Sequence, residues 1–138
     1  MGRIILSVSV QKGVYAVIIL KDGQLINKEV HKVTVGDNIY TQLLNVLVVG
    51  FRMLRQEVEK DLSVSEVIIE LNNSIIIKWF SRGMSKEDYD DAFMEAVQEL
   101  NNIPILYTFT YNSKPKASFY AKEENIEKPK LTGLEDFL

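Results

Sequence analysis

Three segments near the start of the chain have the hydrophobic and polar pattern of β-strands. The pattern predicts strands over Arg3–Val10, Val14–Lys21 and Gln24–Val35. The middle segment is apolar almost throughout, so it is expected to be buried on both faces. An Asp-Gly pair at positions 22–23 is typical of a tight hairpin turn. The three strands should therefore form an antiparallel meander.

The remainder of the chain alternates between helical and strand patterns. The expected elements are a helix over Ile39–Lys60 capped by Asp37 or Asn38, a strand over Ser65–Leu71, a short helical segment over Ser74–Phe80, a helix from Ser85 to about Asn101 with Ser85 and Asp88 as an approximate capping box, a strand over Ile105–Tyr111, and one helical turn over Ala117–Lys122. The order β-β-β-α-β-α-β implies an α/β fold with a mixed five-stranded sheet and helices packed on it.

Composition and charge narrow the classes of function. The chain has 138 residues, of which 46% are hydrophobic and 25% charged, and this suits one globular domain. It has no cysteine, which excludes disulfides and thiolate metal sites. The net charge of -3 provides no global basic field for nucleic acid, so such binding needs a local patch.

The apolar stretches are too short for a membrane span. The longest, Val14–Leu20, cannot cross a bilayer, and the first residues lack the length and cleavage signature of a signal peptide. We therefore expect no membrane association and a cytoplasmic location. The folded domain is expected over residues 1–122, with a charged linker and a tail over residues 123–138.

Several stretches resemble the ribonuclease H superfamily in their order and spacing. VYAVIILKDGQLI is similar to the second strand, the hairpin and the start of the third strand, and TQLLNVLVVGFRML is similar to the first long helix. SEVIIELNNSIIIKWF is similar to the fourth strand and the short helix after it, and PKASFYAKEE to the final helical segment. The resemblance covers about Arg3–Glu124 and implies a ribonuclease H-like fold, which by itself does not fix a function.

The resemblance also implies where catalytic carboxylates would stand. The family's chemistry uses two divalent ions held by Asp and Glu. The corresponding positions here carry only neutral side chains: Ser7 or Ser9 on the first strand, Gln42 on the first helix, Asn72 after the fourth strand, and Ser118 or no clear match near the end. We therefore predict a catalytically inactive module without a metal or another cofactor.

Glu70 is the one carboxylate that leaves an alternative open. It lies two residues before Asn72, on the same face of the predicted strand. Holliday-junction resolvases of the superfamily keep a Glu on this strand, so a divergent metal-dependent nuclease or resolvase is one alternative. The other interpretation of Glu70 is a solvated charge near the strand end. An oligomerisation or protein-interaction domain without any nucleic-acid role is a further alternative.

The leading hypothesis is a module that acts in nucleic-acid metabolism, in replication or recombination, as a nucleic-acid-binding or adaptor domain. The richness in Ile, Asn and Lys suggests an AT-rich, phage-like origin. The candidate nucleic-acid-binding residues are Lys12, Asn73, Lys78, Lys114 and Lys116. We expect weak, salt-sensitive binding of single-stranded or hybrid nucleic acid, because the total charge is acidic.

The last eight residues, LTGLEDFL, form a separate apolar and acidic tail. Helical spacing would place Leu134, Phe137 and Leu138 on one side. The tail resembles the short acidic-aromatic peptides with which replication proteins hold sliding clamps or partner enzymes, so we predict a docking peptide for a protein partner. The alternative is that the tail folds back onto its own domain. The oligomeric state stays open.

Overall fold

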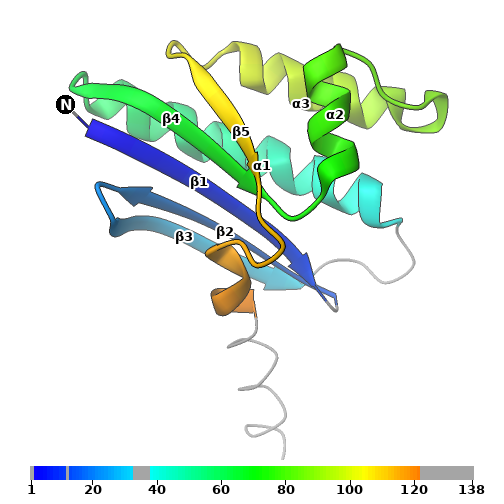
Figure 1. Cartoon of the computed structure of the whole chain (residues 1–138), viewed down its shortest axis with the longest axis horizontal. Coiled ribbons are helices and arrows are strands. Elements are labelled where there is room, and N and C mark those ends of the chain that lie inside the picture. Colours follow the sequence, from blue (N-terminus) through cyan, green and yellow to red (C-terminus); the bar gives the residue numbers. More distant parts are fainter. Residues whose placement is uncertain (1, 12, 33–37, 122–138) are drawn as a thin grey trace, which may run out of the picture.

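The computed structural model describes residues 2–11, 13–32 and 38–121, which form one mixed sheet with helices on its two faces (Figure 1). The elements are β1 (Gly2–Gln11), β2 (Val14–Lys21), β3 (Gln24–Lys32), α1 (Ile39–Lys60), β4 (Val64–Leu71), α2 (Ser74–Arg82), the 3-10 turn η1 (Glu87–Tyr89), α3 (Asp90–Asn101) and β5 (Tyr107–Tyr111). Residues 117–121 add one helical turn after β5.

The five strands have the order β3-β2-β1-β4-β5. β1 pairs antiparallel with β2, and β2 pairs antiparallel with β3. β1 and β5 both run parallel to β4. Asp22 and Gly23 turn the β2–β3 hairpin with positive φ angles of 50° and 86°, which explains why an Asp-Gly pair stands there. The α/β class, the meander and the mixed five-stranded sheet are confirmed.

The larger core lies between the sheet and α1, α2 and α3, which pack on what we call the first face (Figure 1). Alternate residues of β1, among them Leu6 and Val8, point into it with no exposed surface. Gly50 lets α1 approach closely, because a Cβ at this position would lie 3.3 Å from Leu6 Cδ1 and 3.4 Å from Val17 Cγ1. The sheet and α1 therefore form one tightly packed unit.

An aromatic cluster joins α2 to the rest of the first face. Trp79 is only 2% exposed and stacks on Tyr89, with the two ring centroids 5.5 Å apart. Phe80 stacks on Phe109 of β5, with a centroid separation of 5.0 Å. The aromatic residues of α2 thus belong to the core.

A smaller core lies on the opposite, second face. Val14, Ala16 and Ile18 of β2 are buried there against Ala117 and Ala121 of the last helical turn. The two alanines have short side chains, so the backbone of this turn lies close to the sheet. The close approach allows the backbone amides of Lys116 and Ala117 to reach polar side chains of β4 and β1.

The start of the last long helix differs from the predicted start at Ser85. α3 begins at Asp90 after the 3-10 turn, and its N-cap residue, Tyr89, makes no side-chain capping hydrogen bond. The hydroxyl of Ser85 donates to Asp90 Oδ1 at 2.8 Å and does not accept a hydrogen bond from a free backbone amide of the helix. The predicted capping box at Ser85 and Asp88 is therefore wrong. β5 also begins at Tyr107, two residues after the predicted start.

Candidate functional site

The predicted metal positions fall on two sides of the sheet. Ser7 and Ser9 point to the second face, because they pair across the ladder with Ile18 and Ala16. Gln42 lies on α1, the helix that covers the first face. The register of β1 and β4 places Ser7 directly beside Glu70. The polar site of the second face is therefore built around Ser7 and Glu70.

Glu70 is buried in the centre of a hydrogen-bonded network. The residue is 5% exposed, and its carboxylate accepts four hydrogen bonds. Oε1 accepts from the hydroxyl of Ser7 at 2.9 Å and from the backbone amide of Lys116 at 2.7 Å. Oε2 accepts from Asn112 Nδ2 and from Lys116 Nζ, both at 3.1 Å. The Ser7 oxygen in turn accepts from the backbone amide of Ala117 at 2.9 Å.

This geometry corrects the interpretation of Glu70 as a solvated charge. Burial alone would raise the pKa of the Glu70 carboxyl, because it disfavours the charged form. The hydrogen bonds from Lys116, Asn112 and Ser7 outweigh that effect and lower the pKa below its ordinary value of 4.5. Glu70 is therefore an ionised internal anchor that fixes residues 112–117 to the sheet.

The lowered pKa predicts a specific dependence of stability on pH. A carboxyl whose pKa is lower in the folded state stabilises the fold above its unfolded pKa, and this contribution is lost as the pH falls through the folded pKa. We expect the urea midpoint to fall as the pH is lowered below about 5, and to fall more steeply for the wild type than for Glu70→Gln. Parallel curves for the two proteins would contradict this role of Glu70.

The residues around Glu70 do not fit a pair of divalent cations. Both carboxylate oxygens already accept from donors, and the ammonium group of Lys116 lies where it would repel a metal ion. Among the residues that the structure describes, no group of three or more Asp, Glu, His and Cys side chains gathers at one place. The positive charge beside Glu70 is the ammonium group of Lys116.

The other predicted metal positions have separate surroundings. Ser118 is buried, and its hydroxyl donates to the carbonyl of Pro115 at 2.6 Å. Ser9 is fully buried, and its hydroxyl has no hydrogen-bond partner within the described part of the chain. Asn72 follows β4 directly and is half-buried. Neither serine hydroxyl contacts Glu70 in the way that Ser7 does.

The predicted nucleic-acid-binding residues are only partly brought together. Asn73 caps α2, since its side chain accepts from the amide of Ile76 at 3.0 Å. Lys78 is exposed on α2, which packs against β5 on the first face, whereas Lys116 reaches the second face. Lys114 is exposed in the loop that precedes Lys116. Lys12 lies outside the described residues, as do Leu134, Phe137 and Leu138 of the tail.

A basic and aromatic surface on the second face combines the predicted residues Lys114 and Lys116 with residues that were not predicted. The register of β2 and β3 places Lys28 and Lys32 on this face, where Lys28 Nζ lies 5.4 Å from the centre of the Tyr120 ring. Phe119, on the same helical turn as Tyr120, is 62% exposed. We call Lys28, Lys32, Lys114, Lys116 and Phe119 the second-face patch. The sequence signal that could have indicated it is the run KPKASFY at 114–120, in which lysines precede two aromatic residues.

The fold is similar to that of solved ribonucleases H. The RNase H1 of the halophilic archaeon Halobacterium salinarum matches with a TM-score of 0.58 and 11% identity over 85% of this chain and 87% of that one. The N-terminal RNase H domain of a Mycobacterium tuberculosis protein matches with a TM-score of 0.59 and 9% identity over 94% and 99% of the two chains. LC11-RNase H1, solved in complex with an RNA/DNA hybrid, matches with a TM-score of 0.61 and 13% identity over 84% and 89%.

These likenesses establish a ribonuclease H-like fold. No family model and no curated protein sequence matches the chain. None of the helices in the described residues has the length and apolar character needed to cross a membrane.

Proposed function

We propose that this ribonuclease H-like chain is a catalytically inactive module that binds single-stranded or hybrid nucleic acid through the second-face patch. The observation that carries the proposal is the network around Glu70. In it a serine, an asparagine and a lysine surround the Glu70 carboxylate. The network uses Glu70 for structure, and within residues 2–11, 13–32 and 38–121 no second carboxylate joins it to form a pair for metal-assisted hydrolysis.

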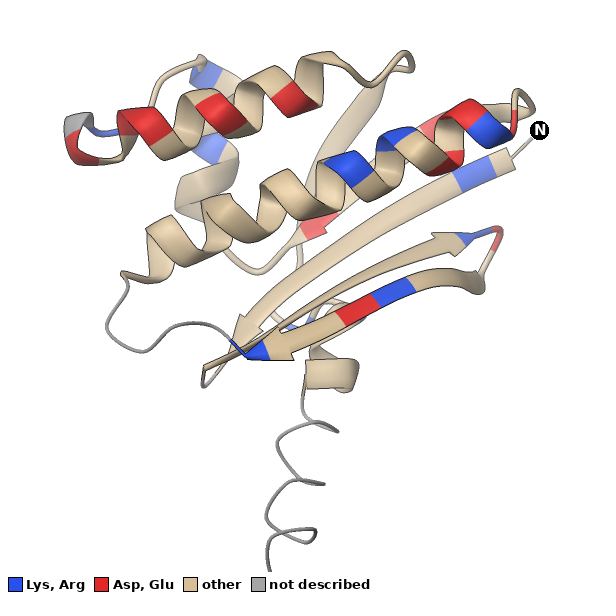
Figure 2. Ribbon diagram, turned by 180° about the vertical axis from the view of Figure 1, so that it is seen from behind, with Lys and Arg blue, Asp and Glu red and all other residues tan. Residues whose placement is uncertain are grey.

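The distribution of charge favours the second face as the binding surface. Acidic residues follow one another along α3, whereas the end of α1 carries basic and acidic residues together (Figure 2). A polyanion is repelled from the acidic surface of α3. On the second face the register groups Lys28 and Lys32 beside the loop that carries Lys114 and Lys116. Lysines of this kind neutralise phosphates and make the affinity depend on salt.

The exposed aromatic ring adds a second contact type. Single-stranded nucleic acid commonly binds where bases stack on aromatic side chains beside a basic groove. Phe119 is exposed on the helical turn between the lysines of β3 and those of the 114–116 loop. LC11-RNase H1 has been solved with an RNA/DNA hybrid, which supports a hybrid as one ligand to test.

Titration of fluorescent oligonucleotides at low salt tests the binding surface. We expect weak binding that fades with added salt, a loss of about tenfold for the pair Lys28→Glu with Lys114→Glu, and a loss of about fivefold or more for Phe119→Ala. The pair Lys60→Glu with Lys86→Glu, which changes the net charge equally on other surfaces, serves as the matched control. Equal losses for the two charge-reversed pairs would refute a defined patch.

The same substrates test the absence of catalysis. Incubation of the wild type with magnesium or manganese should leave an RNA/DNA hybrid, duplex DNA and a four-way junction uncut. Metal-dependent cleavage that disappears in Glu70→Gln would refute the proposal and establish the alternative of a divergent nuclease. Binding and cleavage are measured separately, so either half of the proposal can fail alone.

A further inference from the structure

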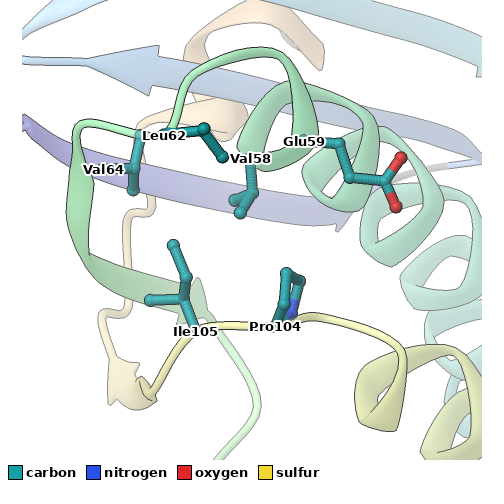
Figure 3. A pocket seen from close by; sticks show the side chains of 6 residues that line it. All are labelled: Val58, Glu59, Leu62, Val64, Pro104 and Ile105. Atoms are coloured by element: carbon teal, nitrogen blue, oxygen red, sulfur yellow. The ribbon is translucent and has the colours of Figure 1, made fainter.

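An apolar groove lies at the end of the sheet where β1 and β4 begin. Its volume is about 360 Å³, and its lining consists of Val58, Glu59, Leu62, Val64, Pro104 and Ile105. Val58 and Leu62 stand on one side, Ile105 and Pro104 stand across from them, and Glu59 lies beyond Val58 with its carboxylate directed away from the others (Figure 3). We call this surface the end groove.

Two large apolar side chains in or next to the lining of the end groove are exposed. Leu62, a lining residue, is 94% exposed, and Leu106, which follows the lining residue Ile105 in the chain, is 90% exposed. The floor is apolar as well, because Val58 and Val64 are buried. A single exposed leucine is ordinary on a protein surface, but two beside an apolar hollow mark an interaction site.

We infer that the end groove is the seat of residues 131–138 of the same chain. This segment, LTGLEDFL, supplies four large apolar side chains, from Leu131, Leu134, Phe137 and Leu138, and no other cluster of this kind follows the last described residue. The groove and the segment match in chemistry, because each presents mainly aliphatic side chains next to charged residues.

The connecting residues are long enough for this arrangement. The amide of Ala117 binds the Ser7 hydroxyl, and the amide of Gly2 binds the carbonyl of Ser63, the neighbour of Leu62. The distance from Ser7 to Gly2 along β1 is about 17 Å, and the helical turn from Ala117 to Ala121, after which the connecting residues begin, adds at most about 6 Å. Residues 122–130 span about 30 Å when extended, so the segment reaches the groove of its own domain. A tether of this length gives the intramolecular partner a high effective concentration.

Engineered cysteines test the proposal, because the natural chain has none. We expect Leu62→Cys with Phe137→Cys to form an intramolecular disulfide under mild oxidation, at least tenfold faster than Leu25→Cys with Phe137→Cys. Leu25 is the matched control, since it is 41% exposed and stands in the β2–β3 hairpin, which contacts Arg3 at the same end of the sheet. Equal rates would show a free tether, and disulfide-linked dimers would show that a second copy fills the groove. Either result overturns the proposal.

Thermal unfolding provides an independent measurement. Deletion of residues 131–138 and the substitution Leu106→Asp should each lower Tm by a few degrees, and the two changes together should lower it no further. Leu25→Asp should lack this coupling to the deletion. A deletion that leaves Tm unchanged would overturn the proposal and return the segment to the role of a docking peptide for another protein.

Discussion

Replacing Glu70 by alanine is expected to destabilise the protein by about 3–5 kcal/mol, the range found when one partner of a buried ionic network is removed. The carboxylate accepts from Ser7, Asn112 and Lys116, and its loss leaves the Ser7 hydroxyl and the Lys116 amide without their acceptor in a largely buried place. The ion pair with the Lys116 ammonium adds little to this value, because that side chain is 49% exposed. Urea unfolding monitored by circular dichroism measures the change.

Glu66→Ala is the matched control for this prediction. Glu66 lies on the same strand and the same face, but its side chain is 50% exposed and its ion pair with Arg3, at 3.1 Å, is on the surface. We expect this substitution to cost less than about 1 kcal/mol. Hydrogen exchange should in addition show faster exchange at the amides of Lys116 and Ala117 in Glu70→Ala only. Similar losses for the two variants would show that Glu70 is not the anchor described above.

The hydrophobic pattern was sufficient to predict most of the helices and strands, because the predicted elements are those with a continuous buried face. The predicted bounds of α1, Ile39–Lys60, agree with the structure, and the Asn38 side chain caps the helix by accepting from the amide of Tyr40. α3 was placed less well. Its first turn depends on the hydrogen bond between Ser85 and Asp90, which competes with the capping role that the sequence suggested for Ser85.

The candidate site was harder to predict, because its contacts join distant parts of the chain. The donors Asn112 and Lys116 stand 42 and 46 residues after Glu70, and only the β1–β4–β5 register brings them together. The local sequence therefore gave no sign that Glu70 is buried. Lys28 and Phe119 of the second-face patch were missed for the same reason, since Lys28 comes from β3 and Phe119 from the helical turn whose Tyr120 lies beside Lys28 on the same face.

The strongest test of the second face is to introduce a carboxylate at Ser7. Ser7→Asp removes the hydroxyl that donates to Glu70 at 2.9 Å and places a second negative charge beside the first. Two carboxyls this close cannot both ionise at low cost, so the pair will retain a shared proton, and its pKa in the folded state will rise above the unfolded value. A carboxyl whose pKa is raised in the folded state stabilises the fold at low pH, and this contribution is lost as the pH rises. The slope of stability against pH is therefore opposite to the slope expected for the wild type.

We expect Ser7→Asp to lose about 3–5 kcal/mol at neutral pH and to regain part of this loss in acid. Ser7→Asn introduces a side chain of the same size as Asp but without its charge. This variant should lose less stability and show no reversal of the pH slope. Unfolding by urea at several pH values, with and without manganese, separates the outcomes. If manganese restores the neutral-pH stability of Ser7→Asp, the second face still accepts a metal once a carboxylate pair is present. If the ammonium of Lys116, which contacts Glu70, keeps a metal ion away, manganese will have little effect until Lys116 is also changed to a neutral residue.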